Sequence, residues 1–554
     1  MFFRIESFTT QDYLNILLLI LLFYIVRFYH NYFTRPNPLP GPLSLPFGLE
    51  NLFYDGDLKR FATTLYNKYG DICEFRLGGY RRIVLSKPDY FENLLTSSKN
   101  LALFTKHEYS PAMDMLGSFG RGLFLNNNYE TWKINKYFFL QSVSTPSFND
   151  DAIKRNIDLF EELDGYWNLL AKSQSCNDGW FEMDFLPWIN RFMSDNISII
   201  VIGERGLSMG SYYNTFNSDK SKLESSSLND PKLFDSDKFT RAIMIYMRGI
   251  IFFHIVPPFL RRYVPFFKKK ADALLENRDF ILRTIENVIE KRKNDLVNTP
   301  QKLKSMNDLL TILITANNDA KNKEAESLTE EDIRTLLLDV FFAGSDTSSN
   351  TLCYIIYFIC HNPHVKQKMF DEIDSVFPNN SSITADLLAK LKYCDAIIKE
   401  ASRMMPVLPV SKRVATGECE VAGYTWPAKT IFQLNYASIH MNEKYWDNPT
   451  VFDPNRFSLQ NDSNEFDYLN NLDKENKKST HNANKYSLVI FGGGIRMCPG
   501  RKLAMINMLS FMVLMFKKYD IELVDREAPL KTHSAFLTNC LELKIKIQPR
   551  KLSL

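Results

Sequence analysis

Three absences narrow the classes of protein to which this 554-residue chain can belong. Its eight cysteines include no Cys-x-x-Cys pair, so neither a disulfide scaffold nor a structural zinc site is indicated, and a reducing compartment fits best. Its 67 basic and 64 acidic side chains leave a net charge of +3, far from the basic surface that nucleic-acid binding needs. The glycine-rich stretch near the C-terminus has methionine at position 497, where a G-x-G-x-x-G loop needs glycine. We therefore expect neither a nucleic-acid partner nor a dinucleotide site.

The most apolar stretch lies near the N-terminus, where residues 13–26 are apolar except for Asn15. A run of 14 residues is more often a core helix or a signal-peptide core than a spanning helix. Aromatic residues beyond the run, the long side chain of Arg27 and the lack of a small-residue cleavage site favour an uncleaved membrane anchor. Because Arg27 and Arg35 follow the run and only Arg4 precedes it, we expect the rest of the chain to face the cytosol.

Five prolines follow the apolar stretch within residues 36–46. Each proline removes a backbone donor and restricts the preceding residue, so this segment cannot be helical. We expect a stiff spacer that fixes the body relative to the anchor, and an ordinary surface loop is the alternative. The sequence thus predicts an N-terminal membrane anchor in residues 1–35 and a large domain in residues 36–554.

Residues 329–361 form the most informative predicted helix. Thr329 can cap its start with Asp332 reaching back, and Asn362-Pro363 ends it. Apolar residues surround the first half and indicate burial, yet residues 343–350 are the largely polar run Ala-Gly-Ser-Asp-Thr-Ser-Ser-Asn. A surface face or a kink would explain such a run, but local rules broken inside a buried helix favour a functional site.

A second candidate site is the loop of residues 491–501, which reads Phe-Gly-Gly-Gly-Ile-Arg-Met-Cys-Pro-Gly-Arg. Its cysteine, Cys498, stands among glycines, near arginines at 496 and 501 and just before a predicted helix, all of which favour a thiolate. Such a thiolate is either a nucleophile or a metal ligand. None of the eight histidines lies in a recognisable partner motif for a nucleophile, so the metal-ligand interpretation leads.

Four ordered motifs make the chain similar to the cytochrome P-450 family: residues 343–348, 400–403, 452–457 and 491–500. The resemblance implies the cytochrome P-450 fold, mainly α with a small β-sheet, in which one large haem domain follows an N-terminal membrane anchor. It also implies haem b (iron protoporphyrin) as the cofactor, with Cys498 as the axial iron ligand. The large domain of residues 36–554 would then be a haem-thiolate catalytic domain.

The resemblance gives a role to each residue on the cysteine side of the haem. The Cys498 thiolate pushes electron density onto the iron and favours cleavage of the O–O bond, and Phe491 packs on the sulfur side. Four residues match the positions that bond the haem propionates: Arg496, Arg413, Trp132 and Lys136. Lys136 departs from the arginine that is usual in the family, because lysine offers a point charge rather than a planar fork.

Two further features of the resemblance concern folding. Glu400, Arg403 and Arg456 resemble a buried triad that locks the haem-binding side, and we assign it to folding rather than to catalysis. A hairpin is expected after the first helix of the body, with strands at Cys73–Leu77 and Arg82–Leu85 and the turn at Gly78-Gly79.

On the other face of the haem, the resemblance assigns Gly344, Asp346 and Thr347 to oxygen activation. Gly344 lets the helix open beside the iron, Thr347 donates a hydrogen bond to dioxygen, and Asp346 helps to relay protons from solvent. The implied substrate walls are the stretch before Trp132, the helix around Phe342, Val407 with Leu408, and residues 534–537. The last two stretches are nearly uncharged, so we expect a lipophilic substrate such as a fatty acid, sterol, terpenoid or xenobiotic.

These assignments predict a membrane-bound monooxygenase that inserts one oxygen atom from dioxygen into a lipophilic small molecule. The chain has no flavin or nicotinamide fingerprint, so electrons are expected from a separate NADPH-dependent reductase, with cytochrome b5 as a further candidate donor. The expected location is the endoplasmic reticulum membrane, with a single anchor and a cytosolic catalytic domain. A haem-thiolate isomerase or dehydratase is the nearest alternative, although the Asp346-Thr347 pair argues against it. A haem-based gas sensor or lipid binder is an alternative of another class.

The phenylalanine-rich segment of residues 250–267 is the last feature of note. Basic residues at 261, 262 and 268–270 edge it, so it could dip into the bilayer at a substrate entrance. A helix-loop-helix packed on the core is an equally good interpretation.

Overall fold

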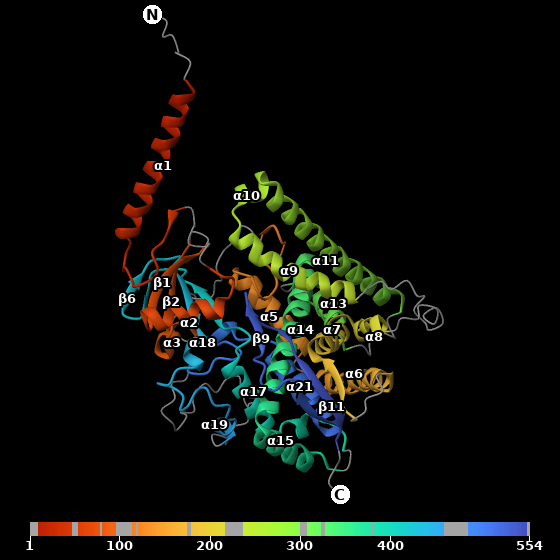
Figure 1. Cartoon of the computed structure of the whole chain (residues 1–554). Helices are drawn as coiled ribbons and strands as arrows, with labels where there is room; N and C mark the ends of the chain where they lie inside the picture. Colours follow the sequence, from red (N-terminus) through yellow and green to blue (C-terminus); the bar gives the residue numbers. More distant parts are fainter. Residues whose placement is uncertain are drawn as a thin grey trace, which may run out of the picture.

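The computed structural model describes residues 9–46, 54–77, 80–95, 114–117, 120–143, 145–173, 179–216, 236–299, 307–322, 327–378, 381–458 and 486–550. Most of these residues are helical, and the strands form four small sheets. Figure 1 shows one helix, α1, projecting from a body whose centre is crossed by α14, with the sheet that contains β1 and β2 to one side. The predicted mainly α fold with a small β-sheet is confirmed.

The helices, with the labels of Figure 1, are α1 Thr10–Phe33, α2 Leu58–Tyr69, α3 Pro88–Leu95, α5 Tyr129–Val143, α6 Pro146–Ser173, α7 Phe185–Ile202, α8 Ser208–Tyr213, α9 Ser236–Ile255, α10 Pro258–Tyr263, α11 Pro265–Asn298, α13 Leu309–Asn322, α14 Glu330–His361, α15 Pro363–Val376, α16 Ala385–Leu388, α17 Lys392–Met404, α18 Tyr436–His440, α19 Asn455–Ser458 and α21 Arg501–Lys518. The strands are β1 Ile72–Leu77, β2 Tyr80–Leu85, β3 Phe181–Asp184, β4 Val410–Val414, β5 Cys419–Val421, β6 Tyr424–Trp426, β7 Ile431–Asn435, β8 Tyr519–Leu523, β9 Lys531–Ser534, β10 Thr538–Glu542 and β11 Lys544–Pro549. Short 3-10 turns occur at Asn214–Phe216 and Gly494–Arg496.

The largest sheet has the strand order β1-β2-β7-β4. Strands β1 and β2 pair antiparallel, as the predicted hairpin requires, while the turn at Gly78-Gly79 lies outside the described residues. Strand β7 runs parallel to β2 and antiparallel to β4, so segments more than 300 residues apart meet in one sheet. The other three sheets are β3-β11-β8, β9-β10 and β5-β6.

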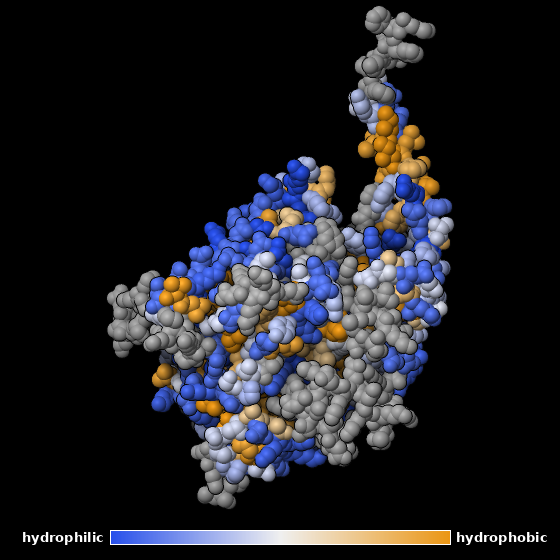
Figure 2. Space-filling model, turned by 180° about the vertical axis from the view of Figure 1, so that it is seen from behind, coloured by the Kyte–Doolittle hydropathy of each residue, from blue (hydrophilic) through white to orange (hydrophobic). Residues whose placement is uncertain are grey.

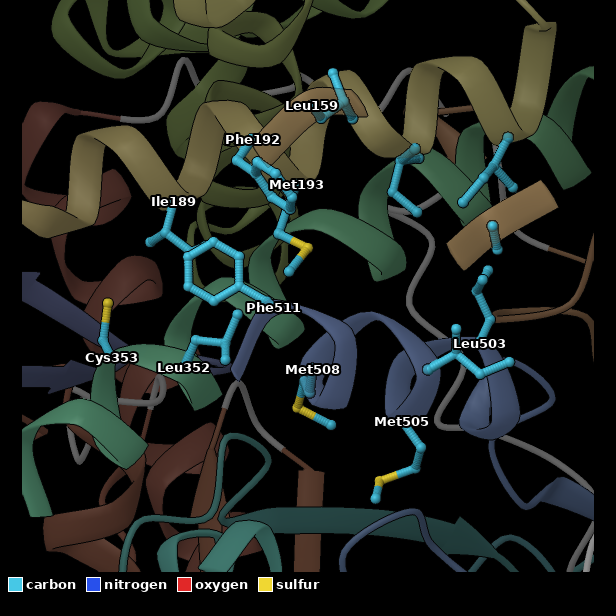
Figure 3. Packing of buried hydrophobic residues seen from close by; sticks show 14 of the residues in the cluster. Leu159, Ile189, Phe192, Met193, Leu352, Cys353, Leu503, Met505, Met508 and Phe511 are labelled. Carbon is cyan, nitrogen blue, oxygen red and sulfur yellow. The ribbon is translucent and has the colours of Figure 1, made fainter. Parts of the chain in front are cut away.

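Helix α14 confirms the predicted central helix and both of its ends. Thr329 caps it, because its hydroxyl accepts from the Asp332 amide while the Asp332 carboxylate accepts from the Thr329 amide. Its 32 residues span roughly 48 Å, enough to cross the body. Helices α7, α14 and α21 share one apolar core, in which Phe511 points between Ile189 and Leu352 (Figure 3).

Helix α1 is longer than the apolar run that predicts it, because helical residues continue through the aromatic stretch to Phe33. Its 24 residues would span roughly 36 Å, slightly more than the hydrocarbon layer of a typical bilayer. Its most apolar window is not buried against the body at all, and large side chains such as Phe23 and Leu19 are exposed. Figure 2 shows apolar residues gathered on this projecting helix, whereas the coloured residues of the body in that view are mainly hydrophilic with scattered apolar patches.

The proline segment after α1 is fixed to strand β1 by the buried Glu74. The Glu74 carboxylate accepts from Arg35 Nε at 2.5 Å and from Arg81 Nε at 2.9 Å, and the Glu74 amide donates to the Pro40 carbonyl at 2.9 Å. Arg81 also donates to the Pro36 carbonyl at 2.7 Å. Residues 35–45 form neither helix nor strand, as the prolines predict, but this contact network ties them to the sheet.

Candidate functional site

The Cys498 loop closes on itself just before α21 begins. The Cys498 amide donates to the Phe491 carbonyl at 2.9 Å, and the Met497 amide donates to the Gly494 carbonyl at 3.1 Å. Gly492 and Gly494 take φ values of +77° and +64°, the left-handed region that favours glycine. The helix predicted after the cysteine is present and begins at Arg501.

Two of the loop glycines are required by a neighbouring helix. A Cβ atom on Gly494 would collide with the Leu95 carbonyl at the end of α3, and one on Gly493 would lie 3.1 Å from Leu95 Cβ. These two glycines therefore let the backbone of the loop lie close to the end of α3. This contact holds the start of the loop at a fixed place relative to the body.

The charge state of Cys498 is set by opposing effects. Its side chain keeps accessible surface, yet the surrounding protein is dense enough that burial raises the pKa of the thiol. A hydrogen bond from the Gly500 amide and the charges of Arg501 and Lys136 act in the opposite direction and are outweighed. These protein groups by themselves therefore favour the thiol, and a further positive charge beside the sulfur, such as a ferric iron, would favour the thiolate.

Three half-buried or buried cations lie near this loop: Arg496, Arg413 and Lys136. Burial lowers the pKa of Arg496 to about 9, and repulsion from Arg413 adds to the shift. Burial and then repulsion from Arg496 also lower the pKa of Lys136. Among the described residues no carboxylate forms an ion pair with any of the three, and Arg496 Nε is buried with no hydrogen-bond partner. Within the described part of the chain, the cluster therefore has no carboxylate partner of its own.

Different elements bring these cations together. Trp132 and Lys136 stand one turn apart on α5, and the Arg496 guanidinium lies 4.2 Å from the centre of the Trp132 ring. Lys136 Nζ donates to the Ile495 carbonyl at 2.7 Å. Arg413 comes from β4, and burial lowers its pKa as well. The structure thus gathers the four residues that the sequence assigned to the propionates.

The polar run of α14 carries a strip of accessible surface in the middle of the helix, where most neighbouring residues are buried. Ala343, Gly344, Asp346 and Thr347 keep accessible surface, while the apolar residues just before them and the serines between and after them are buried. Positions three and four apart share one side of a helix, so this strip faces a single space. Burial raises the pKa of Asp346 to about 6, because protein surrounds the carboxylate. The Thr347 hydroxyl donates to the Ala343 carbonyl at 2.7 Å.

Gly344 has a packing role in the structure. A Cβ atom there would lie 2.5 Å from Ile197 Cδ1 of α7, so glycine lets the two helices approach. Helix α14 is continuous from Glu330 to His361, with no break at Gly344. Close packing with α7 therefore explains this glycine in the structure.

Asp339 is a site residue that the sequence reasoning missed. Its carboxylate accepts from the Leu123 and Phe124 amides at 2.7 and 2.9 Å, and burial raises its pKa to about 7. The same loop turns its Leu123 and Asn126 carbonyls to Arg496, which donates to them at 3.3 and 2.5 Å. The loop thus connects α14 to the Cys498 loop. The only signal in the sequence was one acid within the apolar run before Ala343.

The predicted triad of Glu400, Arg403 and Arg456 is present. Glu400 and Arg403 are fully buried, and their side chains form two hydrogen bonds of 2.7 and 2.8 Å. Arg456 Nε reaches Glu400 at 3.2 Å. Arg403 also donates to the carbonyls of His440 and Pro449. The triad ties α17 to the segment around α19 and touches none of the cations near Cys498, in keeping with a role in folding.

The residues present fit a haem. A buried dianion is what the cations lack, and the two propionates of a haem would supply it, with the Cys498 thiol as the ligand of the iron. Among the described residues no group of three or more His, Cys, Asp or Glu side chains could hold a metal ion by itself. Arg496, Arg413, Lys136 and the Cys498 thiol therefore form a candidate site for a haem.

Comparison with known proteins gives the family. The model of the cytochrome P450 family matches residues 39–547, and the chain belongs to this family. Cytochrome P450 3A12 of Canis lupus familiaris is 23% identical, and cytochrome P450 3A28 of Bos taurus is 24% identical, each over 99% of this chain and 98% of the relative. The solved haem domain of cytochrome P450DA has a TM-score of 0.70 and 18% identity, covering 93% of this chain and 98% of that one.

The protein is thus a cytochrome P450 monooxygenase, and its cofactor is haem. Dioxygen, a lipophilic substrate and a redox partner are implied for the family in general.

Proposed function

We propose that this protein is a membrane-anchored monooxygenase that inserts one oxygen atom from dioxygen into a lipophilic small molecule. Its electrons come from a separate NADPH-dependent reductase, with cytochrome b5 as a further donor. The observation that carries the proposal is a set of buried and half-buried cations near the Cys498 thiol, with which no carboxylate of the described residues forms an ion pair. Such an arrangement is costly unless a dianionic group with a metal centre occupies it.

On the cysteine side, bound haem supplies the one-electron and oxygen chemistry that no side chain can perform. Cys498 ligates the iron, and the Gly500 amide donates a hydrogen bond to its sulfur. Arg496, Arg413, Trp132 and Lys136 hold the propionates, and Phe491 packs beside the ligand loop, where the Arg501 guanidinium lies 5.7 Å from its ring centre.

On the other side, Asp346 and Thr347 manage protons. With a pKa of about 6, the Asp346 carboxylate is poised to take a proton from solvent and release it near neutral pH. The Thr347 hydroxyl, which donates to the Ala343 carbonyl at 2.7 Å, rotates to donate to dioxygen. Gly344, which has no side chain, lets α14 pack closely against α7 next to Asp346 and Thr347. The pair delivers protons in an orderly way to the oxygen that is reduced.

Aromatic side chains from three segments form the proposed substrate wall. The ring of Phe124 lies 5.7 Å from that of Phe342 on α14 and 5.9 Å from that of Phe536, between β9 and β10. Val407 packs against the same core, and Leu537 is buried. A wall of this kind favours a lipophilic ligand.

The anchor of residues 1–35 is proposed to hold the catalytic domain of residues 36–554 on the cytosolic face of the endoplasmic reticulum. Helix α1 has the length and composition of a membrane span. Helix α10 lies on the same side of the body as α1 (Figure 1), and Phe259, Tyr263 and Phe266 at that end are exposed. Phe252 and Phe253 are buried instead, so residues 250–267 both pack on the core and present an aromatic edge. This edge lies against the bilayer.

A reconstituted assay tests the proposal. A panel of lipids is first screened with the haem-loaded protein for a change in iron spin state, which identifies a ligand. With a reductase, that ligand is expected to increase NADPH consumption and to gain one oxygen atom, traced with labelled dioxygen. Conversion of the ligand without NADPH would instead indicate an isomerase or dehydratase, and binding without any conversion would indicate a sensor or a lipid carrier.

A further inference from the structure

The face of α14 beyond Thr347 is fastened to strand β10 by two buried side chains. Asn350 Oδ1 accepts from the Cys540 amide at 2.6 Å, and the Tyr354 hydroxyl donates to the Thr538 carbonyl at 2.6 Å. Asn350 and Tyr354 stand one helical turn apart, and both are buried. Strand β10 contacts α14, and Figure 1 shows its hairpin partner β9 near the centre of the body. These two hydrogen bonds therefore hold the hairpin of β9 and β10 against α14.

Only one of the two side chains also reaches the Asp346 turn. Asn350 Nδ2 donates to the Asp346 carbonyl at 2.7 Å and lies 3.3 Å from Asn539 Oδ1. A helix gives this carbonyl one backbone donor, the amide four residues on, so the side chain adds a second. Tyr354 stands two turns beyond Asp346, and its hydroxyl bonds to β10.

The hairpin of β9 and β10 carries part of the proposed substrate wall. Phe536 lies between β9 and β10 and meets Phe124, which in turn meets Phe342 of α14. Next to Phe536 and Leu537, the Thr538 amide donates to the Val407 carbonyl at 2.7 Å, which brings the stretch after α17 to the same place. The side-chain amide of Asn350 thus links the hairpin that carries Phe536 to the backbone carbonyl of Asp346.

We propose that Asn350 is a positioning residue that couples the substrate wall to proton delivery by Asp346 and Thr347. The amide of Asn350 is planar and rigid, so its Oδ1 bond to Cys540 and its Nδ2 bond to the Asp346 carbonyl move together. A ligand that leaves the β9-β10 hairpin in place preserves the hydrogen bond from Asn350 Nδ2 to the Asp346 carbonyl. A ligand that displaces β10 draws the amide away and leaves that carbonyl with its backbone donor alone. The inference rests on the proposed roles of Asp346 and Thr347.

Asn350→Leu and Tyr354→Phe form a matched pair that tests this coupling in the full-length haem-loaded protein. Each removes a bond to β10, so hydrogen–deuterium exchange at the amides of β10 is expected to increase in both. Only Asn350→Leu also removes the bond to the Asp346 carbonyl. Peroxide formed per NADPH consumed, measured with the reductase, is therefore expected to increase severalfold in Asn350→Leu and to stay near the parent value in Tyr354→Phe.

Equal increases in peroxide for the two variants would overturn the inference, because a loose hairpin alone would then be the cause. A parent-like ratio in Asn350→Leu with faster exchange in β10 would overturn it as well. Asn350→Ala, which removes the same hydrogen bonds to Cys540, Asn539 and Asp346 with a smaller side chain, replaces Asn350→Leu if the latter does not retain haem. Thr347→Ala runs in parallel. An unchanged ratio in Thr347→Ala would overturn the proposed proton delivery and this inference together, whereas an increase there with none at Asn350 overturns the inference alone.

Discussion

The Arg496 guanidinium lies 4.2 Å from the centre of the Trp132 ring, which comes from a helix more than 350 positions earlier in the chain. Arg496 also donates to the carbonyls of Leu123 and Asn126, and no carboxylate of the described residues pairs with it. Burial lowers its pKa to about 9, which means that the charged form is costly in the structure without a bound anion. A group with two carboxylates removes that cost, so haem is expected to stabilise this region markedly when it binds.

Lys136→Met is expected to weaken haem retention. It removes one of the cations proposed for the propionates and leaves the Ile495 carbonyl without its 2.7 Å donor. The rate of haem transfer to an acceptor such as apomyoglobin measures the effect, and an increase of about tenfold corresponds to about 1.4 kcal/mol. Lys133→Met, an exposed lysine on the same helix, is the control and should leave the rate unchanged. Equal rates for Lys136→Met and Lys133→Met would remove Lys136 from the haem site.

Thr347→Ala is expected to retain NADPH consumption while diverting most of it to peroxide. The hydroxyl that donates to the Ala343 carbonyl is the group proposed to donate to dioxygen, and its loss leaves proton delivery disordered. Peroxide and product are measured together with the ligand found in the lipid screen. Thr347→Ser keeps the hydroxyl and should keep most of the product yield. If Thr347→Ala gives as much product per NADPH as the parent protein, Thr347 is only a helix residue.

Asp346→Asn is expected to stabilise the protein near pH 7.5 and to lose that advantage in acid. The pKa of Asp346 is raised from 3.8 to about 6, so the folded state holds this proton more tightly than the unfolded state. The stability contributed by the protonated carboxyl is present below pH 3.8 and is lost as the pH rises through about 6. Removing the charge should therefore gain up to roughly 3 kcal/mol at pH 7.5. Thermal midpoints of the two proteins between pH 5 and 7.5 check this, and a gap that widens in acid would contradict it.

Removal of residues 1–35 is expected to leave a protein that binds haem but associates less with membranes. The most apolar window of helix α1 is not packed on the body, while the proline segment that follows the helix is fixed to β1 through Glu74. Sedimentation with vesicles and the carbon monoxide difference spectrum measure the two properties. A shortened protein that fails to fold would assign the apolar run to the core.

The Glu74→Gln variant tests how the body is oriented on the membrane without removing helix α1, which attaches it. The variant keeps α1 but loses the charge that pairs with Arg35 and Arg81, so the body should tilt more freely on the membrane. Hydrogen–deuterium exchange in nanodiscs is expected to show less membrane-dependent protection of α10. Glu92→Gln, at an exposed position of α3, is the control. Full protection of α10 in Glu74→Gln would show that this network does not set the orientation.

Capping residues and helix-ending residues were enough to predict the helices of this fold that carry such signals in their sequence. The capping pair Thr329 and Asp332 and the stop at Asn362-Pro363 predicted both ends of α14, and the loop before Arg501 predicted the start of α21. The apolar run of residues 13–26 and the aromatic residues beyond it predicted an anchor in residues 1–35, and helix α1 lies within that range.

What the sequence could not supply is the contact of distant residues. The gathering of Arg413 from β4 with Arg496 and Lys136 came from the family resemblance, since no spacing along the chain indicates it. The pairing of Asp339 with two amides of a loop more than 200 residues earlier left no local signal except an acid in an apolar run. The burial that raises the pKa of the Cys498 thiol likewise left no local signal, because burial is a property of the packed structure.

The carbon monoxide difference spectrum of Cys498→Ala tests the central claim most directly. Cys498 is the thiol beside the cluster of unpaired cations, so its loss should abolish the thiolate-type band even where haem is retained. Cys419→Ala, a buried cysteine of β5, is the matched control and should keep the band of the parent protein. Loss of the band in Cys498→Ala alone is the predicted result. A thiolate-type band that persists in Cys498→Ala would contradict the assignment of Cys498 as the haem ligand.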